Sequence, residues 1–463
     1  MRYYFLGIGG IGMSALARYF KLRGDDVSGY DRTESPLTNQ LIAEGIDIHY
    51  DDNPKKIPNN IDLVIYTPAV PQETAEFQYL SQTGIPMEKR SQVLGELTQD
   101  KKCIAVAGTH GKTTTSSMIA YLLSKSDKGC SAFLGGISKN FDSNMVMDSK
   151  SEYMVVEADE YDRSFLQLHP YYSVITATDP DHLDIYGTHE HLLEAFRQYA
   201  SQTNPEGRLF VKEGLLGTGH HHEHDDREHE HKHERPLSSC PIETYTTHGI
   251  EADYYAINIR NYRGNIYFDL RTPSRVLYDL ELQNSCLYNV ENAVAAAAVA
   301  LSCGLDEHQL RYGLKTFAGI RRRFDYRINT PELVYIDDYA HHPKEITATI
   351  DSIKYLYPGK RVVGIFQPHL YSRTADLADE FAKALMPLDE IILMPIYPAR
   401  ENPIPGVTSH LILHKINKMS KYLCTPEQVL EVVPALYPDV LVTMGAGDID
   451  RLVPELEKIM MEN

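Results

Sequence analysis

The sequence lacks an excess of positive charge. Its 45 Lys and Arg residues are outnumbered by 64 Asp and Glu residues, and the formal net charge is −19. A strongly acidic surface repels phosphate backbones and anionic lipids, which argues against nucleic acid and membrane as the main partners. A phosphate-bearing ligand must therefore be met by local clusters of cations.

Long hydrophobic runs and grouped cysteines are missing as well. No uninterrupted run of about 18 apolar residues occurs, so we predict no membrane-spanning helix. The six cysteines are scattered without a C-x-x-C pair, which argues against a disulfide framework and a cysteine-ligated zinc site. Scattered thiols suit a reducing compartment, and we expect a cytoplasmic protein.

The length and composition indicate a soluble protein of several domains. A hydrophobic fraction of 43% and a charged fraction of 24% are those of globular proteins. A chain of 463 residues exceeds what one hydrophobic core usually serves, so two or three domains are expected.

The most informative stretch is residues 108–115, Gly-Thr-His-Gly-Lys-Thr-Thr-Thr. An apolar run at 103–107 precedes it and a helical pattern at 116–123 follows. A strand, a Gly-rich turn and a helix in this order present backbone N–H groups to a phosphate. Lys112 can reach a terminal phosphate, and the Thr113 hydroxyl is placed to contact Mg²⁺.

This motif is a shortened P-loop, because two residues rather than four separate its glycines. The alternative is a Gly/Thr-rich turn with an exposed lysine. We disfavour that alternative because the strand, turn and helix patterns agree with one another.

A second glycine-rich turn lies at the start of the chain. A strand at 3–6 leads into Gly-Ile-Gly-Gly-Ile-Gly at 7–12, then a helix at 13–22 and a strand at 26–30 that ends in Asp31. This order fits a Rossmann-type fingerprint and predicts a diphosphate at the helix N-terminus. It leaves open whether the ligand is NAD, FAD or a nucleotide sugar. Asp31 is either a ligand contact or a solvated turn acid.

Acidic residues follow the strands after the P-loop. A strand at 153–156 leads to Glu157, which we expect to bind Mg²⁺. A strand at 172–176 leads to Asp181-His182-Leu183-Asp184. A lone histidine is usually structural, but the parallel with the Glu157 strand favours a metal role for His182.

Residues 217–234 form a His-rich insertion in which seven histidines are mixed with Asp and Glu. The stretch has no apolar periodicity, so we predict a solvated loop that binds zinc or nickel at most adventitiously. Deleting residues 219–234 should leave kcat nearly unchanged. Steady-state kinetics of the deletion variant would check this, and a large drop in kcat would show that the insertion is functional.

The last third of the chain predicts an open parallel sheet. Strands at 333–336, 362–366, 390–394 and 440–444 each end in polar residues, which would meet at one edge. The cation cluster Arg321-Arg322-Arg323 precedes these strands and is either a phosphate clamp or a solvated basic turn. Before it, Asn289 and Asn292 open an Ala-rich helix, where an Asn is commonly only a cap.

Taken together, these motifs resemble the Mur ligases, ATP-dependent amide-forming enzymes of peptidoglycan assembly, and most closely their alanine-adding branch. The resemblance runs from end to end and rests on residues 7–14, 108–115, 157–162, 181–184, 322–324, 338–343, 366–374 and 445–448. It implies three α/β domains: a Rossmann-like UDP-sugar domain (1–98), a central P-loop ATPase-type domain (99–320) and a Rossmann-like amino-acid domain (321–463).

The resemblance also implies the reaction. ATP phosphorylates the lactyl carboxylate of UDP-N-acetylmuramate, and the amine of L-alanine then attacks the acyl phosphate, giving an amide, ADP and phosphate. We expect Lys112, His182, Arg322 and Arg323 to carry this chemistry, with Mg²⁺ or Mn²⁺ held by Thr113, Glu157 and His182. The expected partners are these two small molecules, and we expect a monomer or a homodimer.

The implied binding residues fall into three groups. ATP would be bound by Gly108, Thr109, His110, Gly111, Lys112, Thr113, Thr114, Asn289, Asn292, Arg323 and Asp338. The UDP-sugar would be bound by Gly7, Gly9, Gly10, Gly12, Met13, Asp31, Thr67, Pro68 and Ala69. The amino acid would be bound by His342, His369 and Arg373.

Two positions depart from patterns known in the family. Tyr288 stands where a histidine is expected, which puts the adenine contact there in doubt. Sister ligases carry a modified lysine near the place of Phe196, and we predict none here.

Three other functions are alternatives to this one. They are a recycling ligase that attaches a tripeptide to the same sugar nucleotide, an NAD(P) oxidoreductase, and a nucleotide-gated binding protein without turnover. The amino-acid sequences of residues 181–186 and 322–325 favour the alanine-adding branch over the recycling ligase. The second leaves the P-loop unused, and the presence of all motif residues argues against the third.

Overall fold

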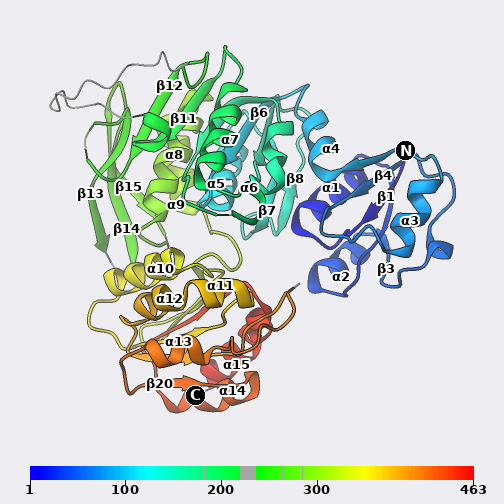
Figure 1. The fold of residues 1–463 in the computed structure, drawn as a ribbon. Coiled ribbons are helices and arrows are strands. Elements are labelled where there is room, and N and C mark those ends of the chain that lie inside the picture. The colour runs from blue at the N-terminus through cyan, green and yellow to red at the C-terminus, as the bar shows by residue number, and fades with distance from the viewer. Residues whose placement is uncertain are drawn as a thin grey trace, which may run out of the picture. The chain divides into compact units, whose positions relative to one another are not determined.

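The computed structural model describes residues 1–181, 183–218, 236–249, 251–262, 264–283, 285–399 and 401–462, without the side chains of Leu183 and Asp184. Three sheets organise the chain (Figure 1). The chain divides into two compact units. One comprises Met1–Asn258, Phe268–Leu280 and Glu291–Phe317, and the other comprises Ile259–Tyr267, Glu281–Val290 and Ala318–Asn463.

The first sheet has the strand order β3-β2-β1-β4-β5 and is parallel throughout. Its strands are β1 (Arg2–Leu6), β2 (Asp26–Tyr30), β3 (Asp47–His49), β4 (Leu63–Tyr66) and β5 (Met87–Lys89), and its helices are α1 (Ile11–Leu22), α2 (Pro36–Ala43), α3 (Ala75–Gln82) and α4 (Arg90–Leu97). The predicted strands at 26–30 and 63–66 are confirmed. The edge strands β3 and β5 were missed because three residues are too few to show a period.

The second sheet has ten strands in the order β15-β14-β13-β12-β11-β10-β6-β9-β7-β8. The strands are β6 (Lys102–Ala107), β7 (Ser131–Ser138), β8 (Ser143–Val146), β9 (Tyr153–Glu157), β10 (Pro170–Ile175), β11 (Arg208–Lys212), β12 (Ile242–Thr246), β13 (Tyr254–Tyr262), β14 (Asn265–Arg271) and β15 (Val276–Leu282). The helices are α5 (Lys112–Ser124), α6 (Leu183–Tyr186), α7 (His189–Ser201), α8 (Asn289–Ser302) and α9 (Glu307–Thr316).

The third sheet has the order β16-β17-β21-β18-β19-β20. Its strands are β16 (Asp325–Asn329), β17 (Val334–Asp338), β18 (Val362–Phe366), β19 (Glu390–Leu393), β20 (Lys421–Leu423) and β21 (Val440–Met444). Its helices are α10 (Pro343–Leu356), α11 (Tyr371–Asp376), α12 (Ala378–Leu385), α13 (His410–Lys415), α14 (Pro426–Ala435) and α15 (Val453–Glu462). The four predicted strands are parallel neighbours, as expected, whereas β16 joins antiparallel to β17.

The first and second sheets share one hydrophobic core inside the first unit. Helix α1 contributes Met13 and Phe20 to this core, and the ring of Tyr19 lies 5.4 Å from the ring of Phe133 on β7. Arg18, only 4% exposed, pairs with Glu44 and donates to Asn144 on β8. These contacts place the first glycine-rich turn and the P-loop in the same compact unit.

Among the described helices, none combines the length and the apolar character that crossing a membrane requires. All six cysteines are buried free thiols.

Candidate active site

The P-loop connects the centre of the second sheet to helix α5. Strand β6 ends at Ala107, α5 begins at Lys112, and the turn between them contains Gly108 (φ +138°) and Gly111 (φ +81°). A Cβ at Gly108 would collide with the Thr176 side chain, and one at Gly111 would lie 2.8 Å from the Asn292 amide oxygen. Both positions therefore require glycine, for space as well as for the positive φ.

Lys112 lies in a buried ion pair. Its Nζ is 2.9 and 2.8 Å from the two carboxylate oxygens of Glu160 and donates to the Gly108 carbonyl at 2.6 Å. Burial raises the pKa of Glu160 and the Lys112 ammonium opposes that rise. Burial alone would lower the pKa of Lys112, but the nearby carboxylates, Glu160 first, raise it. The lysine is therefore held charged at the mouth of the P-loop.

Glu160 is a site residue that the sequence analysis did not single out. It lies three residues past Glu157 in the same acidic stretch, and it is only 1% exposed. The signal was the stretch itself, but spacing alone does not show which acid turns towards the lysine.

Strand β9 extends one residue further than expected, so Glu157 is its last residue rather than the first residue after it. Glu157 pairs in register with Val106 of β6, and a Cβ at Gly135 would collide with its carboxylate. Its Oε2 is buried and has no hydrogen-bond partner among the described residues. A buried oxygen left in this way fits a cation ligand.

Only part of the remaining predicted metal site lies within the described residues. Thr113 lies in the first turn of α5 and is 6% exposed, whereas His182 lies outside the described residues. Within the described ranges, no group of three or more His, Cys, Asp or Glu side chains could hold a metal ion. The metal assignment therefore stays a prediction.

Other predicted ATP residues brace the P-loop. His110 Nε2 lies 3.7 Å from an Asp179 carboxylate oxygen, and the Thr109 hydroxyl accepts from the Asp179 N–H at 3.1 Å. The Thr115 hydroxyl on α5 donates to the Asn292 side-chain oxygen at 3.2 Å. Asn289, one turn earlier on α8, donates to the Ser285 hydroxyl at 3.3 Å. Contacts of these asparagines with adenine stay predictions.

The first glycine-rich turn is formed as predicted, between β1 and α1. Gly7 has φ +84°, and the N–H groups of Gly7 and Ile8 donate to the Tyr30 carbonyl. Asp31 is not merely a solvated acid, because its carboxylate accepts from the Gly9 N–H at 2.7 Å. A negative group thus already sits against the N–H groups that would face a diphosphate.

The remaining predicted UDP-sugar residues divide into two kinds. The loop after β4 closes on the turn, since a Cβ at Gly7 would lie 2.6 Å from the Thr67 methyl group, and the Thr67 hydroxyl accepts from the Ala69 N–H. Met13, in contrast, is 2% exposed in the core. Any contact that Met13 makes with the sugar nucleotide would therefore involve its backbone rather than its side chain.

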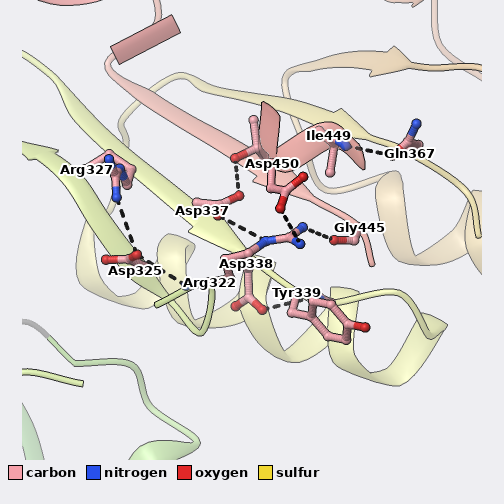
Figure 2. A network of polar contacts seen from close by, with 12 residues as sticks. Arg322, Asp325, Arg327, Asp337, Asp338, Tyr339, Gln367, Gly445, Ile449 and Asp450 are labelled. Atoms are coloured by element: carbon pink, nitrogen blue, oxygen red, sulfur yellow. Dashed lines mark hydrogen bonds and ion pairs between the residues drawn. The ribbon is translucent and has the colours of Figure 1, made fainter. Parts of the chain in front are cut away.

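The Arg322–Arg323 turn of the C-terminal domain is tied down by its own domain (Figure 2). Arg322 Nη2 donates to the Gly445 carbonyl at 2.7 Å, and Nη1 lies 3.3 Å from Asp450. Both guanidinium groups lie over the Tyr339 ring, at 5.2 and 4.9 Å from its centroid. The turn is therefore not a freely solvated basic loop, and its cations are held in place.

Asp338 lies at the centre of this arrangement. Its carboxylate accepts from the N–H groups of Phe324 (3.2 Å) and Ala340 (3.0 Å) and from the hydroxyls of Tyr288 (3.2 Å) and Thr349 (3.0 Å). The side chain is 3% exposed, and burial raises its pKa while Arg323 opposes the rise. Its predicted contact with ATP stays a prediction, and the four bonds show a bracing role.

Tyr288, the residue that stands in place of the expected histidine, belongs to the same arrangement. Its ring packs edge-on against Phe324 at 6.3 Å, and its hydroxyl donates to Asp338. The tyrosine thus has a structural partner in its own unit.

The predicted amino-acid residues come from loops after β17 and β18. His342 caps α10, His369 follows β18, and Arg373 lies on α11. Burial, with a smaller contribution from Arg373, lowers the pKa of His341, whose ring is 6.0 Å from that of His369. Because strands β17 and β18 flank β21 in parallel, their loops meet at one edge.

Three neighbours at this edge were missed. His369 stacks on Tyr397, with the ring centroids 5.8 Å apart. Burial alone would raise the pKa of Glu401, but hydrogen bonds from Ser372, with a smaller contribution from His369, lower it. The ring of His341 lies 6.0 Å from that of His369. Arg373 Nη1 is buried and has no hydrogen-bond partner in the described part of the chain. A buried guanidinium nitrogen with spare donors fits a carboxylate ligand.

The fold and these sites define a three-domain α/β protein with a P-loop and a second glycine-rich turn between a strand and a helix. Three family models match it: the Mur ligase family catalytic domain over residues 2–102, the Mur ligase middle domain over 106–300, and the Mur ligase glutamate ligase domain over 322–447. The chain belongs to the Mur ligase family, and the predicted three-domain α/β fold is confirmed.

The chain is similar to several proteins named as alanine-adding ligases. The chain is 49% identical to the UDP-N-acetylmuramate–L-alanine ligase of Parabacteroides distasonis, covering 99% of this chain and 96% of that one. It is 46% identical to the protein of the same name from Porphyromonas gingivalis W83, covering 98% and 97%. Among solved structures, UDP-N-acetylmuramate-alanine ligase MurC of Thermotoga maritima matches with a TM-score of 0.83 and 29% identity, covering 100% and 99%.

A murein peptide ligase of Psychrobacter arcticus matches with a TM-score of 0.69 at 22% identity, covering 99% and 98%. At that identity the match shows a shared fold only.

Proposed function

We propose that this protein is an ATP-dependent ligase that joins L-alanine to the lactyl carboxylate of UDP-N-acetylmuramate. The observation that carries the proposal is the full-length match, at 49% identity, to the UDP-N-acetylmuramate–L-alanine ligase of Parabacteroides distasonis. The geometry supports it, because a charged lysine lies at a P-loop and a second glycine-rich turn precedes helix α1.

The reaction has two steps with these residues in defined roles. A lactyl carboxylate oxygen attacks the γ-phosphorus of ATP and the bond to the β–γ bridging oxygen breaks, which releases ADP. The alanine nitrogen then attacks the acyl carbon, the C–O bond to phosphate breaks, and the amine proton passes to solvent. In our proposal Lys112 exchanges Glu160 for phosphate oxygens and compensates the charge that moves during transfer.

A divalent cation, Mg²⁺ or Mn²⁺, would be held by Thr113, Glu157 and His182. The unpartnered buried oxygen of Glu157 fits this role. When bound, the cation would neutralise charge on the transferring phosphoryl group.

The C-terminal domain would supply the remaining contacts. We propose that Arg322 and Arg323 reach the phosphates, that Asp338 keeps their turn in shape, and that Asn289 and Asn292 lie near adenine. His342, His369 and Arg373 would receive the amino acid, with the Arg373 guanidinium placed to bind its carboxylate. The six free, buried thiols fit the cytoplasm as the location.

Phosphate release with ATP, Mg²⁺ and UDP-N-acetylmuramate tests the proposal. We expect L-alanine to stimulate release strongly and a tripeptide, L-alanyl-γ-D-glutamyl-meso-diaminopimelate, to stimulate it little. Equal amounts of phosphate and amide product should form. Stimulation by the tripeptide but not by alanine would assign the recycling reaction instead, and an NAD(P) response without a response to UDP-sugar would contradict both.

A further inference from the structure

Arg90, at the first position of α4, contacts the first turn of α1 and the acidic segment that follows β9. Its guanidinium lies against the first turn of α1, where a Cβ at Gly12 would be 2.8 Å from Nη1 and 3.2 Å from Cζ. Helices α1 and α4 lie side by side (Figure 1). The cation therefore sits beside the N–H groups that would bind a diphosphate, and the absent side chain of Gly12 leaves room for it.

The other side of the same guanidinium is occupied by an acid. Arg90 Nη2 donates to Asp159 Oδ2 at 3.3 Å, and the two side chains are 21% and 41% exposed. Asp159 follows β9 and directly precedes Glu160, the partner of Lys112. Its other oxygen accepts from the Tyr161 N–H at 3.1 Å. One arginine thus links the first glycine turn to the acidic segment at the P-loop.

An ion pair that makes one hydrogen bond of 3.3 Å between partly exposed side chains is weak. A diphosphate carries more charge than one carboxylate and binds guanidinium groups in bidentate fashion. When the diphosphate arrives beside Gly12, it competes with Asp159 for the same cation.

We propose that Arg90 is a substrate-binding residue for the diphosphate of the UDP-sugar, and that Asp159 holds it in place until the substrate binds. The inference rests on the proposed function, which supplies the ligand. It makes two predictions of opposite sign. Loss of Arg90 weakens UDP-sugar binding, whereas neutralising Asp159 removes the competitor and strengthens it.

Isothermal titration of the full chain with UDP-N-acetylmuramate, without ATP, tests this. We expect Arg90→Gln to raise the Kd about 10- to 100-fold, the range for hydrogen bonds to a charged group. Asp159→Asn, which keeps the oxygen that accepts from Tyr161, should lower the Kd a few-fold. In the double variant the Asp159→Asn gain should disappear, because the two residues act through one cation.

Arg2→Ala is the matched control. Arg2 makes a comparable ion pair with Asp26 at 3.2 Å, but it begins β1, whereas the glycine turn follows the other end of that strand. The Kd of the Arg2→Ala variant for UDP-N-acetylmuramate should equal that of the unchanged protein. Circular dichroism of each variant checks folding.

The outcomes separate the inference from the proposal beneath it. If the unchanged protein binds UDP-N-acetylmuramate but Arg90→Gln binds it equally well, the inference is wrong and the proposed function stands. If Asp159→Asn weakens binding as much as Arg90→Gln does, the pair is only a structural bridge. No binding by the unchanged protein would overturn the proposed function and this inference with it.

Discussion

Lys112→Ala should lower kcat by roughly 10³-fold while leaving the Kd for UDP-N-acetylmuramate within about two-fold. The loss in rate follows because the substitution removes the cation that the P-loop offers to the transferring phosphoryl group. Sugar-nucleotide binding should survive because the first glycine turn belongs to another sheet. Single-turnover kinetics and isothermal titration measure the two quantities separately, and loss of both in a folded variant would refute the division of labour.

The same substitution should also destabilise the fold in a pH-dependent way. Removing Lys112 leaves Glu160 buried without its ion-pair partner, which costs about 3 kcal/mol in the free energy of unfolding. Burial raises the Glu160 pKa above its ordinary value of 4.5, and Lys112 is the first group that opposes the rise. In the variant the pKa rises further, so stability is retained below pH 4.5 and falls as the pH rises through the new value.

The pair Lys112→Met with Glu160→Gln is the control for this effect. It replaces both charges together, so stability should recover over the whole pH range while kcat stays low. Because the chain contains no tryptophan, unfolding is best followed by far-UV circular dichroism. Recovery of kcat in the double variant would show that the lysine charge is not needed for turnover.

Asp338→Ala should be the most destabilising substitution in the C-terminal domain, at about 4 kcal/mol. It removes the carboxylate that accepts hydrogen bonds from four donors. Two of these donors are the backbone N–H groups of Phe324 and Ala340. Unpaired buried donors cost about 1–3 kcal/mol each. The Arg322–Arg323 turn should loosen as well, because Phe324 is its next residue, and kcat should fall with it.

Two companion variants calibrate that prediction. Tyr288→Phe removes one of the four donors and should cost only about 1 kcal/mol. Asp439→Ala, in the same domain, removes a carboxylate that is 38% exposed, pairs with Lys360 and accepts from the Arg361 N–H, so its cost should be about 1 kcal/mol. Urea unfolding of the full chain orders the three, and equal costs would contradict a central role for Asp338.

The glycine turns and the strands around them were predictable from the sequence to within one or two residues, whereas helix α5 begins four residues before the predicted helical pattern at 116–123. The P-loop, the first glycine turn and the strands at 26–30, 63–66, 362–366 and 440–444 were placed correctly. Each depends on short-range features, such as an apolar run that ends in glycines. The meeting of His369 and Arg373 near His341 was also foreseeable, because the carboxyl ends of parallel strands share an edge.

The partners of the charged groups were not predictable. The sequence singled out Glu157 as a Mg²⁺ ligand but indicated no partner for Lys112, whose ion pair is made by Glu160. The family resemblance places Asp338 near ATP, which stays a prediction, but it gave no hint that the carboxylate accepts from four donors of its own unit. In both cases acids lie close together at the end of a strand, and tertiary packing decides which donors each carboxylate faces.

The sequence by itself determined where the two glycine-rich turns lie between a strand and a helix and in what order the domains follow, because these properties depend on backbone turns and short-range periodicity. Only the tertiary structure decided that Asp31 turns back to Gly9 and that Arg90 stands between Gly12 and Asp159. Those contacts join residues 22 to 78 positions apart along the printed sequence. The packing of helices on a sheet brings them together, and no local pattern records it.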